Sequence, residues 1–205
     1  MINLKIAIQK SGRLNEDSLT LLKECGISIN NGKDQLMAQA SNFRLDVLYL
    51  RNSDIPQYVR DGVADIAIIG DNTEKEKKTG IRHVLDLGFS RCRLSIAVPK
   101  NVDFQDISYL QGKKIATSYP NSLKDFLTEN DIEAEIHEIS GSVEIAPNIG
   151  LADAICDLVS SGSTLFKNGL KEVYKIFESQ AILVANSGLC GEKQELLAQL
   201  VFRIK

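Results

Sequence analysis

Short apolar runs alternate with amphipathic segments from one end of the chain to the other. Near-continuous apolar runs are typical of strands that are buried on both faces of a sheet. Amphipathic runs that start at Ser, Asp or Pro, or stop at Gly, predict helices. We expect strands over residues 4–8, 46–50, 65–69, 93–98, 114–117, 134–139, 154–159, 172–177 and 181–185. We expect helices over residues 15–24, 53–63, 122–129 and 192–204.

This alternation predicts an α/β fold with largely parallel sheets. The pattern restarts near residue 92, after the turn-like segment 88–90. We therefore expect two lobes with a central cleft. Lobe I comprises residues 1–91 and is completed by residues 184–205, and lobe II comprises residues 92–183.

Composition and charge narrow the classes of function. The chain has 205 residues and a net charge of −3, from 24 basic and 27 acidic residues. A nucleic-acid partner is not expected, because such binders usually carry a basic excess. No apolar run approaches the roughly 20 residues of a membrane span, and residues 1–5 show no signal peptide. We expect a cytoplasmic protein with no membrane partner, in which any anion is held by a local cluster of positive groups.

Cysteine and histidine point to no metal or covalent chemistry. The cysteines, Cys25, Cys92, Cys156 and Cys190, are far apart and form no C-x-x-C pair, so we expect reduced thiols and no zinc site. The two histidines lie in strand-like runs, and no Ser-His-Asp or Cys-His set is evident.

The most informative segment is an apolar strand that leads into a loop of small hydroxyl residues. The strand carries Asp157 and follows Asp153, and the loop is Ser160-Ser161-Gly162-Ser163-Thr164. Glycine lets the backbone curl so that successive N–H groups point at one spot, and the hydroxyls add donors. This order suits a phosphate monoester, with Asp157 accepting hydrogen bonds from the hydroxyls of an attached ribose. The alternative is a surface loop with a solvated carboxylate.

Basic side chains follow two other predicted strands. Lys10 and Arg13 come after the strand that ends at Ile8, and Arg51 comes after Leu50. Arginine offers a planar fork of donors that suits phosphate oxygens, so Arg13 and Arg51 are the first candidates. The alternative for each is a surface salt bridge.

Three further residues leave two interpretations open. Glu144 opens a predicted helix and either approaches a ribose or metal or is a first-turn carboxylate. Asp71 stands at a strand end, where it either faces the cleft or does not. Tyr119 either flanks a nucleotide base or packs half-buried.

The segment 144–165 resembles the signature of ATP phosphoribosyltransferase. The matching residues are Glu144, Gly150, Ala152, Ile155, Asp157, Leu158, Ser161, Gly162, Thr164 and Leu165. Segments 9–14, 50–56, 65–71 and 116–120 resemble other loops of that family. The resemblance thus spans nearly the whole chain.

The resemblance implies a two-lobed fold like that of type II periplasmic binding proteins. It implies transfer of a phosphoribosyl group from phosphoribosyl pyrophosphate to N1 of ATP, with release of pyrophosphate, as the first step of histidine biosynthesis. Mg²⁺ is expected to arrive bound to the substrate, without dedicated protein ligands. The catalytic candidates are Arg13, Arg51 and Lys10. The candidates for binding phosphoribosyl pyrophosphate are Asp153, Asp157, Ser160, Ser161, Gly162, Ser163 and Thr164. Weaker candidates near ATP or the metal are Ser11, Gly12, Asp71, Tyr119 and Glu144.

The resemblance also bears on partners. Inhibition by AMP and ADP and a homodimer are expected. The long form of the family carries a further C-terminal domain that binds histidine, whereas the short form works with a separate regulatory partner. The loops at residues 9–13 and 117–120 are closer to those of the long form, which suits a truncated long form. A natural short form is the alternative, and the sequence does not decide between them. The alternative function is a non-catalytic nucleotide- or solute-binding module of the same fold, since fold does not fix function.

Overall fold

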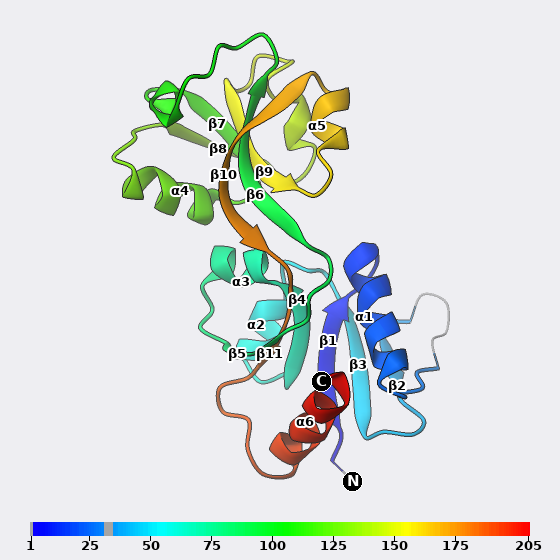
Figure 1. Cartoon of the computed structure of the whole chain (residues 1–205). Helices are drawn as coiled ribbons and strands as arrows, with labels where there is room; N and C mark the ends of the chain where they lie inside the picture. The colour runs from blue at the N-terminus through cyan, green and yellow to red at the C-terminus, as the bar shows by residue number, and fades with distance from the viewer. Residues whose placement is uncertain (1, 31–34) are drawn as a thin grey trace. The chain divides into compact units, whose positions relative to one another are not determined.

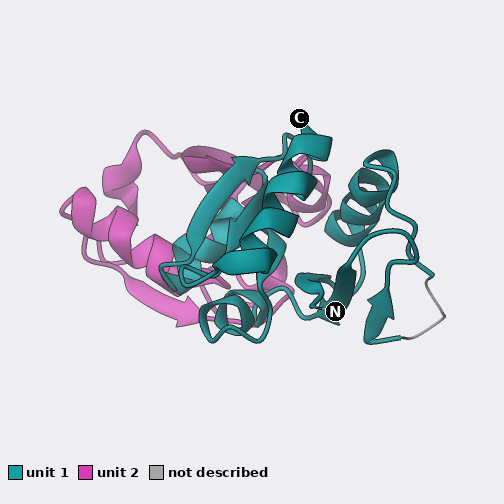
Figure 2. Cartoon of the chain, turned by 90° about the horizontal axis from the view of Figure 1, so that it is seen from below, with its two compact units in different colours: residues 1–90, 180–205 teal, residues 91–179 magenta. Residues whose placement is uncertain are grey.

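A computed structural model of the chain describes residues 2–30 and 35–205. The chain divides into two compact units, each with its own sheet (Figures 1 and 2). Unit 1 comprises residues 1–90 and 180–205, and unit 2 comprises residues 91–179. Strands and helices alternate in both units, which confirms the α/β class.

Unit 1 is built on a six-stranded sheet with the strand order β2-β3-β1-β4-β11-β5. Its strands are β1 (Leu4–Gln9), β2 (Met37–Gln39), β3 (Leu45–Leu50), β4 (Ile66–Gly70), β5 (Arg82–Asp86) and β11 (Ala181–Ala185). Its helices are α1 (Arg13–Glu24), α2 (Ile55–Arg60), α3 (Asp71–Lys77) and α6 (Gly191–Ile204). β1 pairs in parallel with both β3 and β4, so the carboxyl ends of these strands lie at one edge.

Alternate side chains of β1 pack on opposite faces of this sheet, as the two-residue period of a strand requires. Ile6 packs in one cluster with Leu22 of α1 and Leu197 of α6. Ala7 packs in a second cluster with Ile55 of α2. The sheet is therefore covered by helices on both faces, which explains why its central strands are almost wholly apolar.

Unit 2 is built on a five-stranded sheet with the strand order β10-β6-β9-β7-β8. Its strands are β6 (Cys92–Pro99), β7 (Lys114–Thr117), β8 (Glu135–Glu138), β9 (Ala154–Val159) and β10 (Leu170–Ser179). Its helices are α4 (Pro120–Glu129) and α5 (Ser163–Lys167), with 3-10 turns η1 (Ile107–Leu110) and η2 (Val143–Ile145).

The two faces of β9 have different neighbours. Cys156 packs in a cluster with Phe126 of α4, and Ile155 packs in another with Leu165 of α5 and Val143 of η2. Since side chains alternate along a strand, Asp157 lies on the same face as Ile155, the face that α5 and η2 cover.

The expectation of largely parallel sheets holds only among β3, β1 and β4 and among β9, β7 and β8, and it is wrong for the other pairs. The pairs β1–β3, β1–β4, β7–β8 and β7–β9 are parallel. The pairs β2–β3, β4–β11, β5–β11, β6–β9 and β6–β10 are antiparallel. Parallel neighbours need a long crossover, whereas β2 reaches β3 through a short hairpin, residues 40–44, whose turn the apolar pattern does not reveal. None of the helices in residues 2–30 and 35–205 has both the length and the apolarity needed to cross a bilayer.

Candidate active site

The hydroxyl-rich loop directly follows β9 and leads into α5. Gly162 has φ 78° and ψ 0°, a left-handed conformation that favours glycine. The Ser161 Oγ lies 3.0 Å from the Ser163 Oγ, and the Ser163 N–H donates to the Ser161 Oγ at 3.4 Å. The first N–H groups of a helical turn have no intrahelical acceptor, and the side chains of Ser161, Ser163 and Thr164 are exposed. The loop thus gathers hydroxyl and N–H donors at one exposed place that suits an anion.

Asp157 stands three residues before the loop and is partly buried. The pKa of its carboxyl is raised from 3.8 to about 6, chiefly by burial and to a smaller extent by the negative charge of Glu144. A hydrogen bond of 2.8 Å from the Leu158 N–H acts in the opposite direction. The structure therefore brings Glu144 close enough to Asp157 for the two carboxyls to interact.

The other candidates of unit 2 follow β7, which lies beside β9, and β8, which lies beside β7. β7, β8 and β9 run parallel, so their carboxyl ends meet at one edge. Tyr119 follows β7, Glu144 follows β8, and the loop follows β9. The Ser118 Oγ donates to the Ile139 carbonyl at 2.6 Å and links the segments after β7 and β8. This edge is where ligands of open α/β sheets usually bind.

Asp153 does not belong to this edge, contrary to the expectation from sequence. It precedes β9, and its Oδ2 accepts a hydrogen bond of 2.9 Å from the Lys114 N–H at the start of β7. The six residues of β9 separate it from the loop, a distance of about 20 Å at ~3.3 Å per residue. Asp153 thus fixes the start of β9 against β7, and the structure does not bring it to the loop.

The basic candidates of unit 1 lie at the carboxyl ends of two adjacent parallel strands. Lys10 follows β1, Arg13 begins α1, and Arg51 follows β3. The Lys10 N–H donates to the Leu50 carbonyl at 2.8 Å and so joins the two loops. All three basic side chains are exposed, and the Arg13 Nε lies 3.7 Å from the Asp17 carboxylate.

The weaker candidates of unit 1 lie at the same edge of its sheet. Gly12 has φ 88° and precedes α1, and the Gln9 Nε2 donates to the Ser11 carbonyl at 2.7 Å. Asp71 follows β4 and begins α3, where its carboxylate pairs with Lys75 at 2.6 Å. Asp71 therefore has a cation of its own helix as a partner.

Comparison with known proteins assigns this chain to a family. The family model described as HisG, ATP phosphoribosyltransferase, matches residues 51–205. The ATP phosphoribosyltransferase of Cytophaga hutchinsonii is 59% identical over 201 residues, which are 98% of this chain and 70% of that protein. That of Phocaeicola vulgatus is 52% identical over 98% of this chain and 71% of its own length. The chain belongs to the ATP phosphoribosyltransferase family.

Solved structures agree with this family and with the fold expected from sequence. A chain of the ATP phosphoribosyl transferase (HisG:HisZ) complex from Thermotoga maritima has a TM-score of 0.82 at 30% identity, with 98% of each chain covered. The substrate binding protein of an amino acid ABC transporter has a TM-score of 0.63 at 12% identity, covering 98% of this chain and 91% of its own. This second likeness shows the fold alone, which is that of the type II binding proteins.

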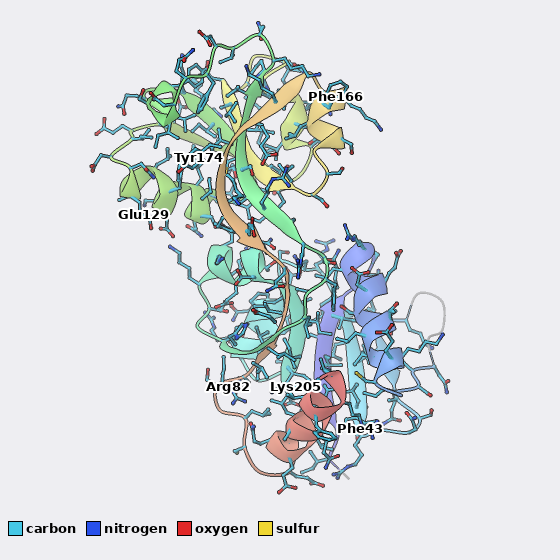
Figure 3. All side chains as sticks on the ribbon, viewed as in Figure 1. Phe43, Arg82, Glu129, Phe166, Tyr174 and Lys205 are labelled. Atoms are coloured by element: carbon cyan, nitrogen blue, oxygen red, sulfur yellow. The ribbon has the colours of Figure 1, made fainter. Side chains whose placement is uncertain are left out.

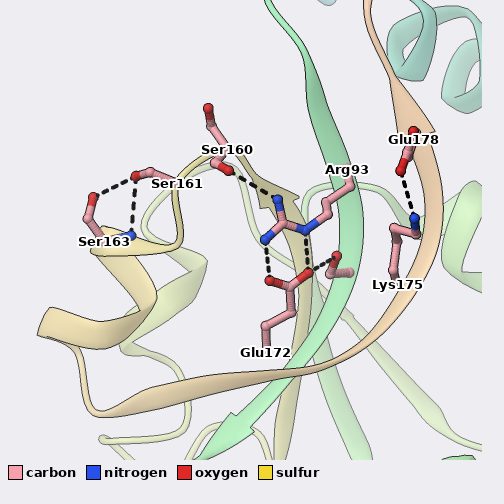
Figure 4. Close-up of polar contacts among 8 residues, drawn as sticks. Arg93, Ser160, Ser161, Ser163, Glu172, Lys175 and Glu178 are labelled. Carbon is pink, nitrogen blue, oxygen red and sulfur yellow. Dashed lines mark hydrogen bonds and ion pairs between the residues drawn. The ribbon is translucent and has the colours of Figure 1, made fainter.

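Neither the apolar pattern nor the resemblance to ATP phosphoribosyltransferases points to Arg93 and Glu172, which the structure links to the loop. The Arg93 Nη1 donates to the Ser160 carbonyl at 3.1 Å, and the Arg93 guanidinium forms an ion pair with Glu172 at 2.5 Å (Figure 4). The two residues are 79 positions apart, so no local pattern predicts their contact.

Lys100 holds the other side of α5. Its ammonium lies 3.4 Å from the centre of the Phe166 ring and donates to the Phe166 carbonyl at 3.2 Å. Phe166 is exposed on α5, the helix that the loop leads into (Figure 3). A cation therefore contacts each end of the segment formed by the loop and α5. Arg93 of β6 binds the Ser160 carbonyl, and Lys100, directly after β6, binds the Phe166 carbonyl.

Asn52 is a further residue that the sequence did not single out. It follows Arg51, and its Nδ2 donates to the Thr73 Oγ1 at 2.9 Å. Its Oδ1 is buried and has no hydrogen-bond partner within residues 2–30 and 35–205. Such a buried acceptor has no signal in the sequence, because its burial depends on packing against α3.

Proposed function

We propose that this chain transfers the 5-phosphoribosyl group from phosphoribosyl pyrophosphate to N1 of ATP, the first step of histidine biosynthesis. The bond between C1 of the ribose and the pyrophosphate oxygen breaks, and its electron pair leaves with pyrophosphate. A bond forms between C1 and the adenine N1. Membership of the ATP phosphoribosyltransferase family, with relatives of that name at 50–59% identity, supports this assignment.

The main structural support is the combination of loop and carboxylates at one edge of unit 2. In this proposal the N–H and hydroxyl groups of residues 161–164 bind the 5-phosphate. Asp157 and Glu144 accept hydrogen bonds from the ribose hydroxyls. A carboxylate near C1 also stabilises the positive charge that develops on the ribose as pyrophosphate departs.

Three exposed basic side chains of unit 1 provide positive charge for the leaving pyrophosphate. Lys10, Arg13 and Arg51 are proposed to stabilise the negative charge that grows on the leaving pyrophosphate. Arginine binds such oxygens through two parallel donors, which also orients the group. The adenine N1 carries no proton that must be removed before attack, so the reaction requires no strong general base.

Mg²⁺ is proposed to enter as part of the substrate, bound to the pyrophosphate. Within the described part of the chain no three His, Cys, Asp or Glu residues form a metal-binding group. The pair Glu144 and Asp157 fits the habit of Mg²⁺, which takes one or two carboxylates, retains waters and binds phosphate oxygens. A bound ion would lower the negative charge of the leaving group.

The partners follow from the same proposal. AMP and ADP are expected to inhibit by occupying the nucleotide part of the site, and the chain is expected to form a homodimer. The likeness to a chain of the HisG:HisZ complex supports a second subunit as a regulatory partner.

The test is pyrophosphate release from the purified chain. We expect release only when ATP, phosphoribosyl pyrophosphate and Mg²⁺ are all present. A chain that binds one of the substrates without releasing pyrophosphate would instead be a binding module.

A further inference from the structure

The carbonyl of the first loop residue is held by a guanidinium from a neighbouring strand. The Arg93 Nη1 donates to the Ser160 carbonyl at 3.1 Å. The Nε and Nη2 of Arg93 donate to the two oxygens of Glu172 on β10, at 2.6 and 2.5 Å. The Ser95 Oγ donates to the same Glu172 Oε1 at 2.8 Å. Three hydrogen bonds thus fix the plane of the guanidinium (Figure 4).

We propose that Arg93 is a positioning residue that sets the direction of the Ser161 N–H in the phosphate loop. In a planar trans peptide the C=O of one residue and the N–H of the next point in opposite directions. The described residues contain no cis peptide bond. Because Arg93 holds the Ser160 C=O on its own side, the Ser161 N–H must point to the other. This inference rests on the proposed function, in which the loop binds the 5-phosphate.

Because Glu172 pairs with the guanidinium, we propose that Arg93 acts on the loop through the Ser160 carbonyl and does not bind the phosphate itself. The Glu172 carboxylate occupies the Nε–Nη2 edge of the guanidinium and neutralises the charge. The hydrogen bond from Arg93 lowers the pKa of Glu172, and the bond to Glu172 raises the pKa of Arg93. Both groups are therefore charged at neutral pH.

The test compares Arg93→Gln and Arg93→Lys with the unaltered chain. We expect Arg93→Gln to raise the KM for phosphoribosyl pyrophosphate about 10-fold, the effect of losing one hydrogen bond from a charged donor. The Kd for ribose 5-phosphate, measured by calorimetry, should rise by the same factor. The KM for ATP should change less than about twofold. Arg93→Lys should lie between the two, because one ammonium does not hold Glu172 and Ser160 in the same plane.

The matched control is Lys175→Gln. Lys175 forms an ion pair of 2.6 Å with Glu178 on β10, the strand that also carries Glu172 (Figure 4). Its loss should leave both constants unchanged. A purely structural role for Arg93 would lower the active fraction, and hence kcat, without changing KM or Kd. If Arg93→Gln does not fold, Arg93→Lys and Glu172→Gln provide the same comparison.

Binding of ribose 5-phosphate separates this inference from the proposed function. It needs the loop but not the chemistry at N1, so it is informative even if the chain releases no pyrophosphate. The inference is overturned if both Arg93 variants bind ribose 5-phosphate like the unaltered chain. It is also overturned if Lys175→Gln weakens binding equally, or if the unaltered chain does not bind ribose 5-phosphate at all.

Discussion

Asp157 is the residue whose pKa the fold changes most clearly. Burial holds its pKa at about 6 in the folded state, above the ordinary value of 3.8. Between these two pH values the folded chain binds more protons at this site than the unfolded chain does. The contribution of Asp157 to the free energy of unfolding therefore falls as pH rises from about 3.8 to about 6, and it stays low above that range.

Replacement of Asp157 by asparagine tests this sign. At pH 8 the variant should unfold with a higher free energy than the unaltered chain, by at most about 3 kcal/mol, since one pH unit of pKa difference corresponds to ~1.4 kcal/mol. At pH 3.5, where the folded carboxyl is neutral and the unfolded one is mostly neutral, the difference should shrink to less than about 0.5 kcal/mol. Urea unfolding at both pH values is the measurement, with Glu129→Gln at the exposed end of α4 as the control (Figure 3). An equal difference at both pH values would contradict the burial of this charge.

Arg13 and Arg51 of unit 1 should contribute to catalysis more than to stability. Arg13→Ala and Arg51→Ala should each lower kcat by about 10²–10³-fold, the typical loss for one donor to a developing charge. The KM for ATP should change less. The lost pair of Arg13 with Asp17 is exposed, so the free energy of unfolding should change by less than about 1 kcal/mol.

The matched control for these arginines is Arg60→Ala. Arg60 ends α2, is 53% exposed and pairs with its neighbour Asp61 at 3.4 Å. Steady-state kinetics should show an unchanged kcat for this variant. The proposed roles fail if kcat of the Arg13 and Arg51 variants stays within about twofold of that of Arg60→Ala.

At the scale of elements, the segment from β9 through the loop to α5 depends on the conformation of Gly162. A Cβ at this position would lie 3.9 Å from the Val159 Cγ1, which is ordinary contact, so space is not the obstacle inside the protein. The left-handed φ of 78° is the obstacle, because it costs a non-glycine residue about 1–2 kcal/mol, and more if the residue is β-branched.

Gly162→Val should therefore abolish binding of phosphoribosyl pyrophosphate in a calorimetric titration. Gly169→Val is the control, because Gly169 has φ 71° just after α5 and carries the same strain outside the loop. It should destabilise the chain similarly and still bind. Asp157→Asn should weaken binding more mildly, since an amide keeps one acceptor oxygen. If the Gly162 variant binds like the unaltered chain, the loop is not the phosphate site.

The central strands and the loop are predictable from sequence because their signals are local. A buried parallel strand such as β9 reads as an apolar run, and the turn after it reads as small residues around Gly162. The contacts of the loop with Arg93, and of Asp153 with β7, depend on which strands lie side by side. Strand order is set by packing across the sheet, and this packing produces no periodic pattern in the sequence. The same holds for the antiparallel strand pairs.

At the scale of the whole molecule, the cationic candidates belong to unit 1 and the phosphate loop belongs to unit 2. The matched relatives are longer than this chain, which covers 70% of the first and 71% of the second. Allosteric inhibition requires a second site and two states that an effector distinguishes. The resemblance implies that the long form of the family binds histidine in its C-terminal domain. That domain lies outside the part of the long form that residues 1–205 match.

We therefore expect histidine not to inhibit the polypeptide of residues 1–205 by itself, whereas AMP and ADP should inhibit it. Initial rates over a range of histidine concentrations, at saturating and subsaturating substrate, are the measurement. Saturable inhibition at micromolar histidine would place a regulatory site within these residues and would contradict the expectation.

The central claim is that C1 of the ribose moves from pyrophosphate to the adenine N1. Phosphoribosyl pyrophosphate labelled with ¹³C at C1 and ATP labelled with ¹⁵N in adenine follow that step directly by NMR. We predict that a one-bond coupling between ¹³C and ¹⁵N appears at the same rate as free pyrophosphate, in equal amount. Pyrophosphate release without that coupling would mean hydrolysis, and the absence of both would mean that the chain is not a phosphoribosyltransferase.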